Sequence, residues 1–248
     1  MSILAQKTVT LVTGGNGGIG FALVAALLTN PSNHVLLGSR SIEKGQKAIA
    51  DLEFLKPLGT VELLQVDVSS EESINAAAKQ VKSKHGKLDA LVNNAAIAIP
   101  PGSLAEQMAI CFQTNATGPL LMVEAFTPML LKSDQTPRII NVSTGQGSIT
   151  KRLDPTAPGY KIKGIQYRAS KTALNMVTAS QVAELGEQGV KVFAYDPGFT
   201  QSSLGPHNKA EFGAKPASEA AAPIIKVLNG ERDSEHACFL HATGQFPW

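Results

Sequence analysis

The sequence predicts an α/β protein in which a doubly wound parallel sheet is flanked by helices. Short, continuously apolar segments alternate along the chain with longer segments of helical pattern. Strands that are apolar throughout are buried on both faces, as they are in a parallel sheet covered by helices. The chain has 248 residues and is 43% hydrophobic, which suits one domain of this class, so we expect residues 1–248 to form a single unit.

Each element of the first half is identified by its apolar pattern and its ends. We expect strands over 8–12, 34–39, 61–66 and 88–94, and helices over 18–28, 41–55 and 69–85. The β-branched strand at 8–12 stops at a glycine cluster, and the helix at 41–55 has its apolar residues on one side. Ser69 or Ser70 can cap the third helix, whose first turn is acidic.

The second half continues the alternation after a mostly helical region at 104–132. We expect strands over 138–144 and 190–196, helices over 166–186 and 218–229, and a last strand over 237–242. The segment 145–166, rich in glycine, proline and polar residues, is predicted to be a loop. Ligands of doubly wound proteins bind beyond the carboxyl ends of the strands, so we expect 145–166 and 199–217 to shape a substrate pocket.

Composition and charge exclude several other classes of protein. A net charge of +2 is too small to predict binding to nucleic acid or a membrane surface. No run of 18 apolar residues is present, and MSILAQK at the start has no targeting pattern. Cys111 and Cys238 form no disulfide framework, which favours a reducing, cytoplasmic location. The five histidines are scattered without metal-ligand spacing, so no metal site is expected.

The first predicted strand ends in TGGNGGIG, residues 13–20. A glycine turn between a strand and a helix lets the backbone approach a pyrophosphate, and the helix N-terminus presents unpaired N–H groups to it. Gly14, Gly18 and Gly20 have the spacing GxxxGxG. An ordinary tight connection also uses glycines, but the position after the first strand favours a dinucleotide site.

The TGxxxGIG pattern resembles that of the short-chain dehydrogenase/reductase family, and further segments match the family in its order. They are LVNNAA (91–96), TNATG around Asn115, NVST (141–144), YRASK (167–171) and DPGFTQS (196–202). The matches cover roughly residues 8–202, and the last 45 or so residues carry no assigned motif. The resemblance implies a Rossmann-like, single-domain, carbonyl-reductase-like oxidoreductase. The chain departs from the family pattern at Ala96, in place of glycine, and at Thr144, in place of serine.

The end of the second strand indicates which nicotinamide cofactor is used. Ser39 and Arg40 stand where NAD-binding relatives place an acid, and arginine can bind a 2′-phosphate, so we predict NADPH rather than NADH. A solvated surface arginine is the alternative. Asp67 is expected to accept a hydrogen bond from the adenine amino group, to cap the next helix, or both. The full set of predicted cofactor contacts is Gly14, Asn16, Gly18, Ile19, Gly20, Ser39, Arg40, Asp67, Val68, Asn94, Tyr167, Lys171, Pro197, Gly198, Phe199 and Thr200.

Two tyrosines stand near lysines in GYKIKGIQYRASK, residues 159–171. Tyr167 and Lys171 are four apart at the start of a predicted helix and therefore share one face, whereas glycine and proline around Tyr160 disfavour a helix. Carbonyl reduction needs a proton donor, and a nearby ammonium lowers the pKa of a tyrosine from about 10. We predict that Tyr167 is the acid/base, that Lys171 tunes it and holds the nicotinamide ribose, and that Tyr160 lies in a loop near the substrate.

The resemblance adds Asn115 and Thr144 to the catalytic set. Thr144 would polarise the carbonyl, with Ser143 as the substitute if the register shifts by one residue. Asn115 would lie in a kinked helix and hold a water that links Lys171 to solvent. The apolar pocket candidates, which favour a hydrophobic or aromatic substrate, are Ile97, Ile99, Ile149, Leu153, Tyr160, Phe199, Leu204 and Phe212.

These observations predict an NADPH-dependent oxidoreductase that reduces a ketone or aldehyde to an alcohol, or runs the reverse reaction. The same site could instead serve imine reduction or a non-redox cyclisation. A third possibility is an NADPH-binding sensor without turnover, against which the intact Tyr–Lys pair argues. The insertion before Tyr167 lies next to a helix that many relatives use for dimer contacts, while some carbonyl reductases with insertions there are monomers. A homo-oligomer is therefore possible, and the oligomeric state is left open.

Overall fold

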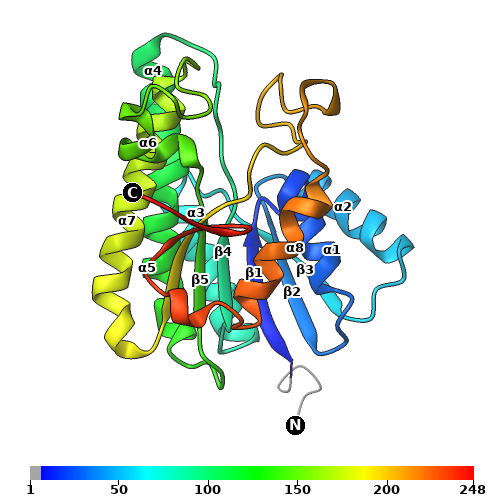
Figure 1. Ribbon diagram of the computed structural model, residues 1–248. Helices are drawn as coiled ribbons and strands as arrows, with labels where there is room; N and C mark the ends of the chain where they lie inside the picture. Colours follow the sequence, from blue (N-terminus) through cyan, green and yellow to red (C-terminus); the bar gives the residue numbers. More distant parts are fainter. Residues whose placement is uncertain (1–6) are drawn as a thin grey trace.

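The computed structural model describes residues 7–248. The prediction that the first seven residues, MSILAQK, have no targeting pattern therefore lies outside the described residues, except at Lys7. One eight-stranded sheet runs through the protein in the order β3-β2-β1-β4-β5-β6-β7-β8 (Figure 1). All neighbours pair in parallel except β7 and β8, which are antiparallel. The strand order reverses between β1 and β4, which confirms the predicted doubly wound sheet.

The strands follow the predicted order with small differences at their ends. They are β1 Thr8–Thr13, β2 Asn33–Ser39, β3 Thr60–Gln65, β4 Ala90–Asn93, β5 Arg138–Val142, β6 Lys191–Asp196, β7 Phe239–His241 and β8 Gly244–Phe246. The helices are α1 Gly18–Leu27, α2 Ile42–Phe54, α3 Glu71–Lys84, α4 Leu104–Phe112, α5 Gly118–Leu130, α6 Ile149–Leu153, α7 Ile165–Leu185 and α8 Ala217–Leu228. Short 3₁₀ turns and one π-helix, η2 Gln113–Thr117, complete the set.

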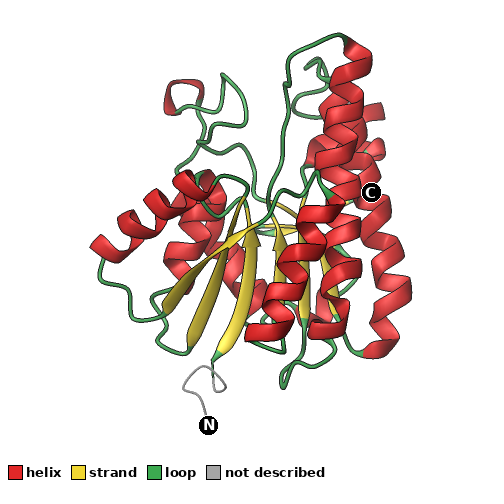
Figure 2. Ribbon diagram, turned by 180° about the vertical axis from the view of Figure 1, so that it is seen from behind, coloured by secondary structure: helices red, strands yellow, loops and turns green. Residues whose placement is uncertain are grey.

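Helices cover both faces of the sheet, so the apolar strands are buried as predicted. Helices α1, α2 and α8 pack on one face around Leu23, Leu52 and Ile224, in front of the sheet in Figure 1. Helices α3, α5 and α7 pack on the other face around Ile74 and Phe126, which Figure 2 shows from behind. The two cores fix the sheet between them, and the loops at the carboxyl ends of the strands remain free to form a site.

Serine side chains begin several helices. Ser70 accepts a hydrogen bond from the N–H of Ser73 at the start of α3, which confirms one of the two predicted caps. Asp67 is not that cap; its Oδ1 accepts from the N–H and the hydroxyl of Ser69 at 2.9 and 2.6 Å. Ser103 forms a capping box with Glu106 at the start of α4.

Two elements differ from the sequence prediction, and an expected irregularity within a third is present. The segment 145–166 is not entirely a loop, because Ser148 caps the short helix α6. The chain end forms a hairpin of two strands, β7 and β8, and not one strand. The helical region 104–132 is interrupted by the π-helix η2, which contains Asn115. This irregularity lies where the sequence predicted a kinked helix. Within the described residues, no helix is long and apolar enough to cross a bilayer.

Candidate active site

A cavity of about 1780 Å³ opens at the carboxyl ends of the strands. It is continuous from the glycine turn after β1 and Arg40 after β2 to Tyr167 and Lys171 on α7. The predicted site residues that line it are Gly14, Asn16, Gly18, Ile19, Ser39, Arg40, Asp67, Val68, Asn94, Thr144, Tyr167, Lys171, Pro197, Gly198, Phe199 and Thr200. Gly20 and Asn115 do not line it.

The glycine turn is held open by backbone conformations and by close packing. Gly14 has φ +64°, a left-handed conformation that favours glycine. A Cβ on Gly20 would collide with the carbonyl oxygen of Gly14 and the amide of Asn94, so glycine is required there for the close packing of α1 against the turn. Asn94 donates from Nδ2 to the carbonyl of Thr13 at 2.8 Å and thereby ties β4 to the turn. The start of α1 therefore lines the cavity, and the hydrogen bond from Asn94 fixes the position of the turn before it.

The cavity has basic side chains at the end of β2 and the start of α2. Arg40 is exposed and forms no ion pair with any residue from 7 to 248. Ser39 is buried, and its hydroxyl donates to the carbonyl of Ser41 at 2.9 Å. This hydroxyl proton is therefore already used within the protein and is less available to a cofactor than the sequence suggested. Lys44, one turn into α2, lies at the same end of the cavity. The positive charges of Arg40 and Lys44 at this end of the cavity can bind an anion.

Asp67 follows β3 and keeps part of its carboxylate available. Oδ1 is used by Ser69, whereas Oδ2 has no hydrogen bond within the described chain. Val68 is buried beside it and lines the same wall. A hydrogen-bond acceptor next to an apolar surface suits an aromatic base with an amino group.

The first turn of α7 brings Tyr167 and Lys171 together, as the spacing of four residues predicted. Nζ of Lys171 lies 5.9 Å from the centroid of the Tyr167 ring. Lys171 is only 2% exposed, and its Nζ donates to the carbonyl of Val142, at the end of β5, at 2.7 Å. The lysine therefore connects the helix to the central sheet.

Burial sets the protonation of this pair in the protein alone. It raises the pKa of Tyr167 well above its usual range, and the negative charge of Asp196 adds to the shift. Burial also lowers the pKa of Lys171 to about 7, against the opposing effect of Asp196. This direction is opposite to the expected lowering of the pKa of Tyr167 by Lys171, because burial disfavours the charged phenolate. Tyr167 holds its proton at neutral pH.

The two candidate hydroxyls after β5 have different partners. Ser143 is 3% exposed, and its Oγ donates to Oδ1 of Asn175 at 2.6 Å. Thr144 is half-buried and lines the cavity, and its Oγ1 only accepts a long hydrogen bond of 3.3 Å from the N–H of Gln146. The hydroxyl proton of Thr144 therefore remains available for a ligand, whereas that of Ser143 is used within the protein.

Asn115 is fully buried in η2, and its side chain is occupied by the protein. Oδ1 accepts from the N–H of Ile97, while Nδ2 donates to the carbonyl of Ile97 and to Oγ of Ser170. Ser170 in turn donates to the carbonyl of Tyr167 at 2.8 Å. Asn115 thus links the segment after β4 to the first turn of α7, a role that the sequence did not reveal. The predicted water next to Lys171 stays a prediction.

Asp196, the last residue of β6, lines the cavity and accepts hydrogen bonds from two turns beside it. It was not predicted as a site residue. Its Oδ2 accepts from the N–H of Gly145 at 2.8 Å, and its Oδ1 accepts from the N–H of Gly198 at 2.7 Å. One carboxylate therefore fixes both the turn after Thr144 and the turn before Phe199. Its place directly before Pro197-Gly198 at a strand end was the available sequence signal.

The segment 145–166 meets the chain end at the side of the cavity. Ser148 and Thr150 donate from their hydroxyls to the main-chain oxygen of Trp248 at 3.3 and 3.0 Å. Arg168, buried on α7, donates to the carbonyl of Gly159 at 2.7 Å. Tyr160 lies in a turn, as predicted, but its ring packs against Arg152 and does not line the cavity.

The predicted apolar lining is correct in half of its members. Ile97, Ile99, Phe199 and Leu204 line the cavity, whereas Ile149, Leu153, Tyr160 and Phe212 do not. Sequence reasoning missed Ile110 on α4 and Ile162 before α7, together with the polar residues Gln166 and His207. These residues come from segments with no motif, and only the folded chain brings them together.

Comparisons with known proteins agree with this geometry. The family model for short chain dehydrogenases matches residues 8–211. The chain is 36% identical to the short-chain dehydrogenase/reductase tropE of Talaromyces stipitatus, with 94% of each chain covered. It is 35% identical to the short-chain dehydrogenase/reductase eupG of a Phoma species, with 95% of each covered.

Solved structures with the same fold include proteins that hold a nicotinamide cofactor. The NADPH-bound carbonyl reductase from chicken fatty liver is 29% identical, with a TM-score of 0.84 over 98% of this chain and 100% of that one. A short chain dehydrogenase from Burkholderia cenocepacia in complex with NADP is 25% identical, with a TM-score of 0.77 over 97% of each chain.

The doubly wound sheet, the glycine turn and the cavity at the switch in strand order define a Rossmann-like oxidoreductase that uses a nicotinamide cofactor. The chain belongs to the short-chain dehydrogenase family. Its family membership confirms the resemblance inferred from the six motifs.

Proposed function

We propose that the protein reduces a ketone or aldehyde to an alcohol with NADPH, or catalyses the reverse oxidation. The observation that supports this most is that one cavity joins Tyr167 and Lys171 to Arg40, which is exposed and has no ion-pair partner among residues 7–248. The NADPH- and NADP-bound structures of related proteins favour the same cofactor. A cytoplasmic location and a small apolar substrate remain predictions that accompany this proposal.

The residues present fit a bound NADPH. Gly14, Gly18 and Ile19 would hold the pyrophosphate, and Arg40 with Lys44 would hold the 2′-phosphate. Asp67 would accept from the adenine amino group, and Lys171 would hold the nicotinamide ribose. Asn94 acts by fixing the glycine turn, and Phe199 with Thr200 would face the nicotinamide. When bound, the cofactor supplies a hydride.

The chain itself supplies the proton and the polarising groups. Tyr167 keeps its phenolic proton because burial raises its pKa, so it is in the correct form to protonate a developing alkoxide. The Thr144 hydroxyl is free to donate to the carbonyl oxygen. Lys171, with a pKa lowered to about 7, can exchange a proton near neutral pH. Ile97, Ile99 and Phe199 would exclude water from the reacting atoms.

The test is a panel of apolar, aromatic and polar ketones and aldehydes with NADPH, followed by absorbance at 340 nm. Tyr167→Phe should lower turnover by about 10²–10⁴-fold and keep NADPH affinity. Tyr160→Phe, outside the cavity, should keep both turnover and NADPH affinity. Tight NADPH binding with no reduction across the panel would instead favour the sensor. Reduction of imines alone, or cyclisation without cofactor consumption, would favour the other use of the same site.

A further inference from the structure

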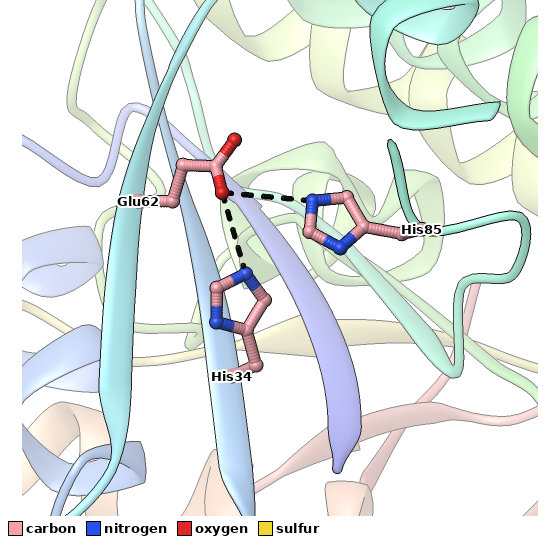
Figure 3. Close-up of side chains that lie close together, drawn as sticks. All are labelled: His34, Glu62 and His85. Atoms are coloured by element: carbon pink, nitrogen blue, oxygen red, sulfur yellow. Dashed lines mark ion pairs between the residues drawn. The ribbon is translucent and has the colours of Figure 1, made fainter. Parts of the chain in front are cut away.

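A second group of polar side chains lies away from the cavity, near the amino ends of β2 and β3 (Figure 3). His34 comes from β2, Glu62 from β3, and His85 is the C-cap residue of α3. The Nε2 atoms of both histidines lie 3.6 Å from Oε2 of Glu62. One potential ligand atom from each residue lies within 4.8 Å of the other two. The three therefore point at one small volume.

The two imidazoles are buried and incompletely hydrogen-bonded. Neither Nε2 atom has a hydrogen-bond partner in the described part of the chain. The side chains of His34 and His85 are 5% and 2% exposed. His34 uses its other nitrogen, since Nδ1 lies 2.8 Å from Oγ1 of Thr60. Buried polar atoms without partners are rare and point to an additional ligand.

The protonation of the group suits a cation. Burial lowers the pKa of His34 to about 4, and it lowers the pKa of His85 as well. Both rings are therefore neutral at pH 7 and offer lone pairs, while Glu62 contributes a negative charge. Neutral imidazoles with one carboxylate are ligands that zinc and similar metals prefer, whereas magnesium and calcium prefer oxygen atoms alone.

One competing charge is already present. Nζ of Lys84 lies 2.7 Å from Oε2 of Glu62, and Lys7, the residue directly before β1, donates to Oγ1 of Thr60 close to His34. The Lys84 side chain is 51% exposed, whereas that of Glu62 is 17% exposed. The ammonium can therefore leave for solvent when a stronger cation arrives, and Glu62 stays in place. A metal ion and Lys84 are alternatives at one carboxylate.

We propose that His34, Glu62 and His85 bind one divalent transition-metal ion of the zinc type, with solvent as a further ligand. Metal–ligand bonds of about 2.0–2.2 Å place tetrahedral ligand atoms about 3.3 Å apart, close to the 3.6 Å already present for each histidine and Glu62. Binding would connect β2, β3 and α3. The site lies outside the cavity, so it stands independently of the proposed reaction.

The test uses the full chain without a polyhistidine tag, stripped with EDTA. Zn²⁺ affinity is measured by competition with a chromophoric chelator, and Co²⁺ is added to detect the visible absorption of tetrahedral sites. We expect one ion per chain, a higher Tm with Zn²⁺, and no effect of Mg²⁺. Glu62→Gln and His85→Gln should weaken Zn²⁺ binding on the order of tenfold or more. His207→Gln, on an exposed loop, is the matched control and should leave it unchanged.

A fourth variant separates a metal site from an ionic cluster. Lys84→Met removes the competing ammonium and keeps all three ligands, so it should tighten Zn²⁺ binding. Circular dichroism of each metal-free variant checks that it is folded. Absence of Zn²⁺ binding, or affinity unchanged in the Glu62→Gln and His85→Gln variants, overturns the proposal. So does a Lys84→Met protein that is less stable but binds Zn²⁺ no more tightly, because the cluster would then be an ion pair alone.

Discussion

Nζ of Lys171 lies 5.9 Å from the centre of the Tyr167 ring and donates to the carbonyl of Val142. Helix spacing brings the two side chains to one face, while the hydrogen bond to the end of β5 fixes the lysine. Burial raises the pKa of the phenol and lowers the pKa of the lysine to about 7. The pair is assembled before anything binds, and its charge state is set by burial.

Tyr167→Phe should lower kcat by about 10²–10⁴-fold, because it removes the proposed proton donor and leaves the cavity shape almost unchanged. NADPH affinity, measured by fluorescence titration, should change little. Tyr160→Phe is the control, since its ring packs on Arg152 outside the cavity. Equal losses in the two variants would show that Tyr167 is not the acid.

Thr144→Val should lower kcat on the order of 10²-fold with little loss of stability, because only the free hydroxyl is removed. Thr144→Ser should retain most activity. Ser143→Ala, unlike Thr144→Val, should lower stability more than kcat. It leaves the buried Oδ1 of Asn175 without this donor and should cost about 1–3 kcal/mol of unfolding free energy. Steady-state kinetics and urea unfolding measure the two effects, and a Ser143→Ala enzyme that is stable but inactive would reverse the assignment.

Arg40→Ala should weaken NADPH binding on the order of tenfold and leave NADH binding nearly unchanged, because only the 2′-phosphate needs the guanidinium. Lys82→Ala, an exposed charge on α3, removes the same charge at a distance from the cavity. KM for both cofactors and for both variants gives the comparison. If NADH and NADPH suffer alike in Arg40→Ala, the predicted cofactor preference fails.

Lys171 should make stability depend on pH. Its pKa is lowered from 10.5 to about 7 in the folded protein, so above pH 7 the unfolded chain binds more protons at this position. The contribution of Lys171 to the free energy of unfolding should therefore rise from about pH 7 to 9.5, by at most about 1.4 kcal/mol per pH unit. The difference in unfolding free energy between wild type and Lys171→Met, measured by urea unfolding over this pH range, isolates the contribution of Lys171. A difference that does not change with pH would contradict the lowered pKa.

Asp196→Asn should lower both stability and turnover, because an amide cannot accept from Gly145 and Gly198 at once. We expect a loss of about 1–3 kcal/mol in unfolding free energy. Removal of the negative charge should also lower the pKa of Lys171 further, which shifts the pH profile of the reaction downward. Asp134→Asn, on an exposed side chain, is the control. A stable Asp196→Asn enzyme with a normal pH profile would argue against this positioning role.

The sequence predicted most of the fold because its signals are local. Apolar strands such as β1 and capped helices such as α3 are encoded in contiguous residues, and the family motifs fall at strand ends that topology brings together. The short helix α6 and the strand β8 were missed. The start of α6 is held by a contact with Trp248, far away in the chain. Strand β8 is only three residues long and pairs with β7 alone, so its apolar pattern is too short to identify it.

The site was predicted less completely for the same reason. Motif spacing identified Tyr167 and Lys171, but not that burial would raise the pKa of the phenol. The hydrogen bonds from Asn115 to Ser170 and from Gly145 to Asp196 cannot be read from neighbours in the sequence, because the partners lie on other elements. The scattered histidines predicted no metal site, yet the pairing of β2 with β3 and the end of α3 bring two of them to one carboxylate.

The bonds from Ser148 and Thr150 to Trp248 attach the last residue of the sequence to a segment whose members Gly145, Gln146 and Lys151 line the cavity. Deleting the last three residues would remove these bonds from a segment that lies about a hundred positions earlier in the sequence. Substrate selectivity should therefore respond to trimming of a tail that carries none of the family's motifs.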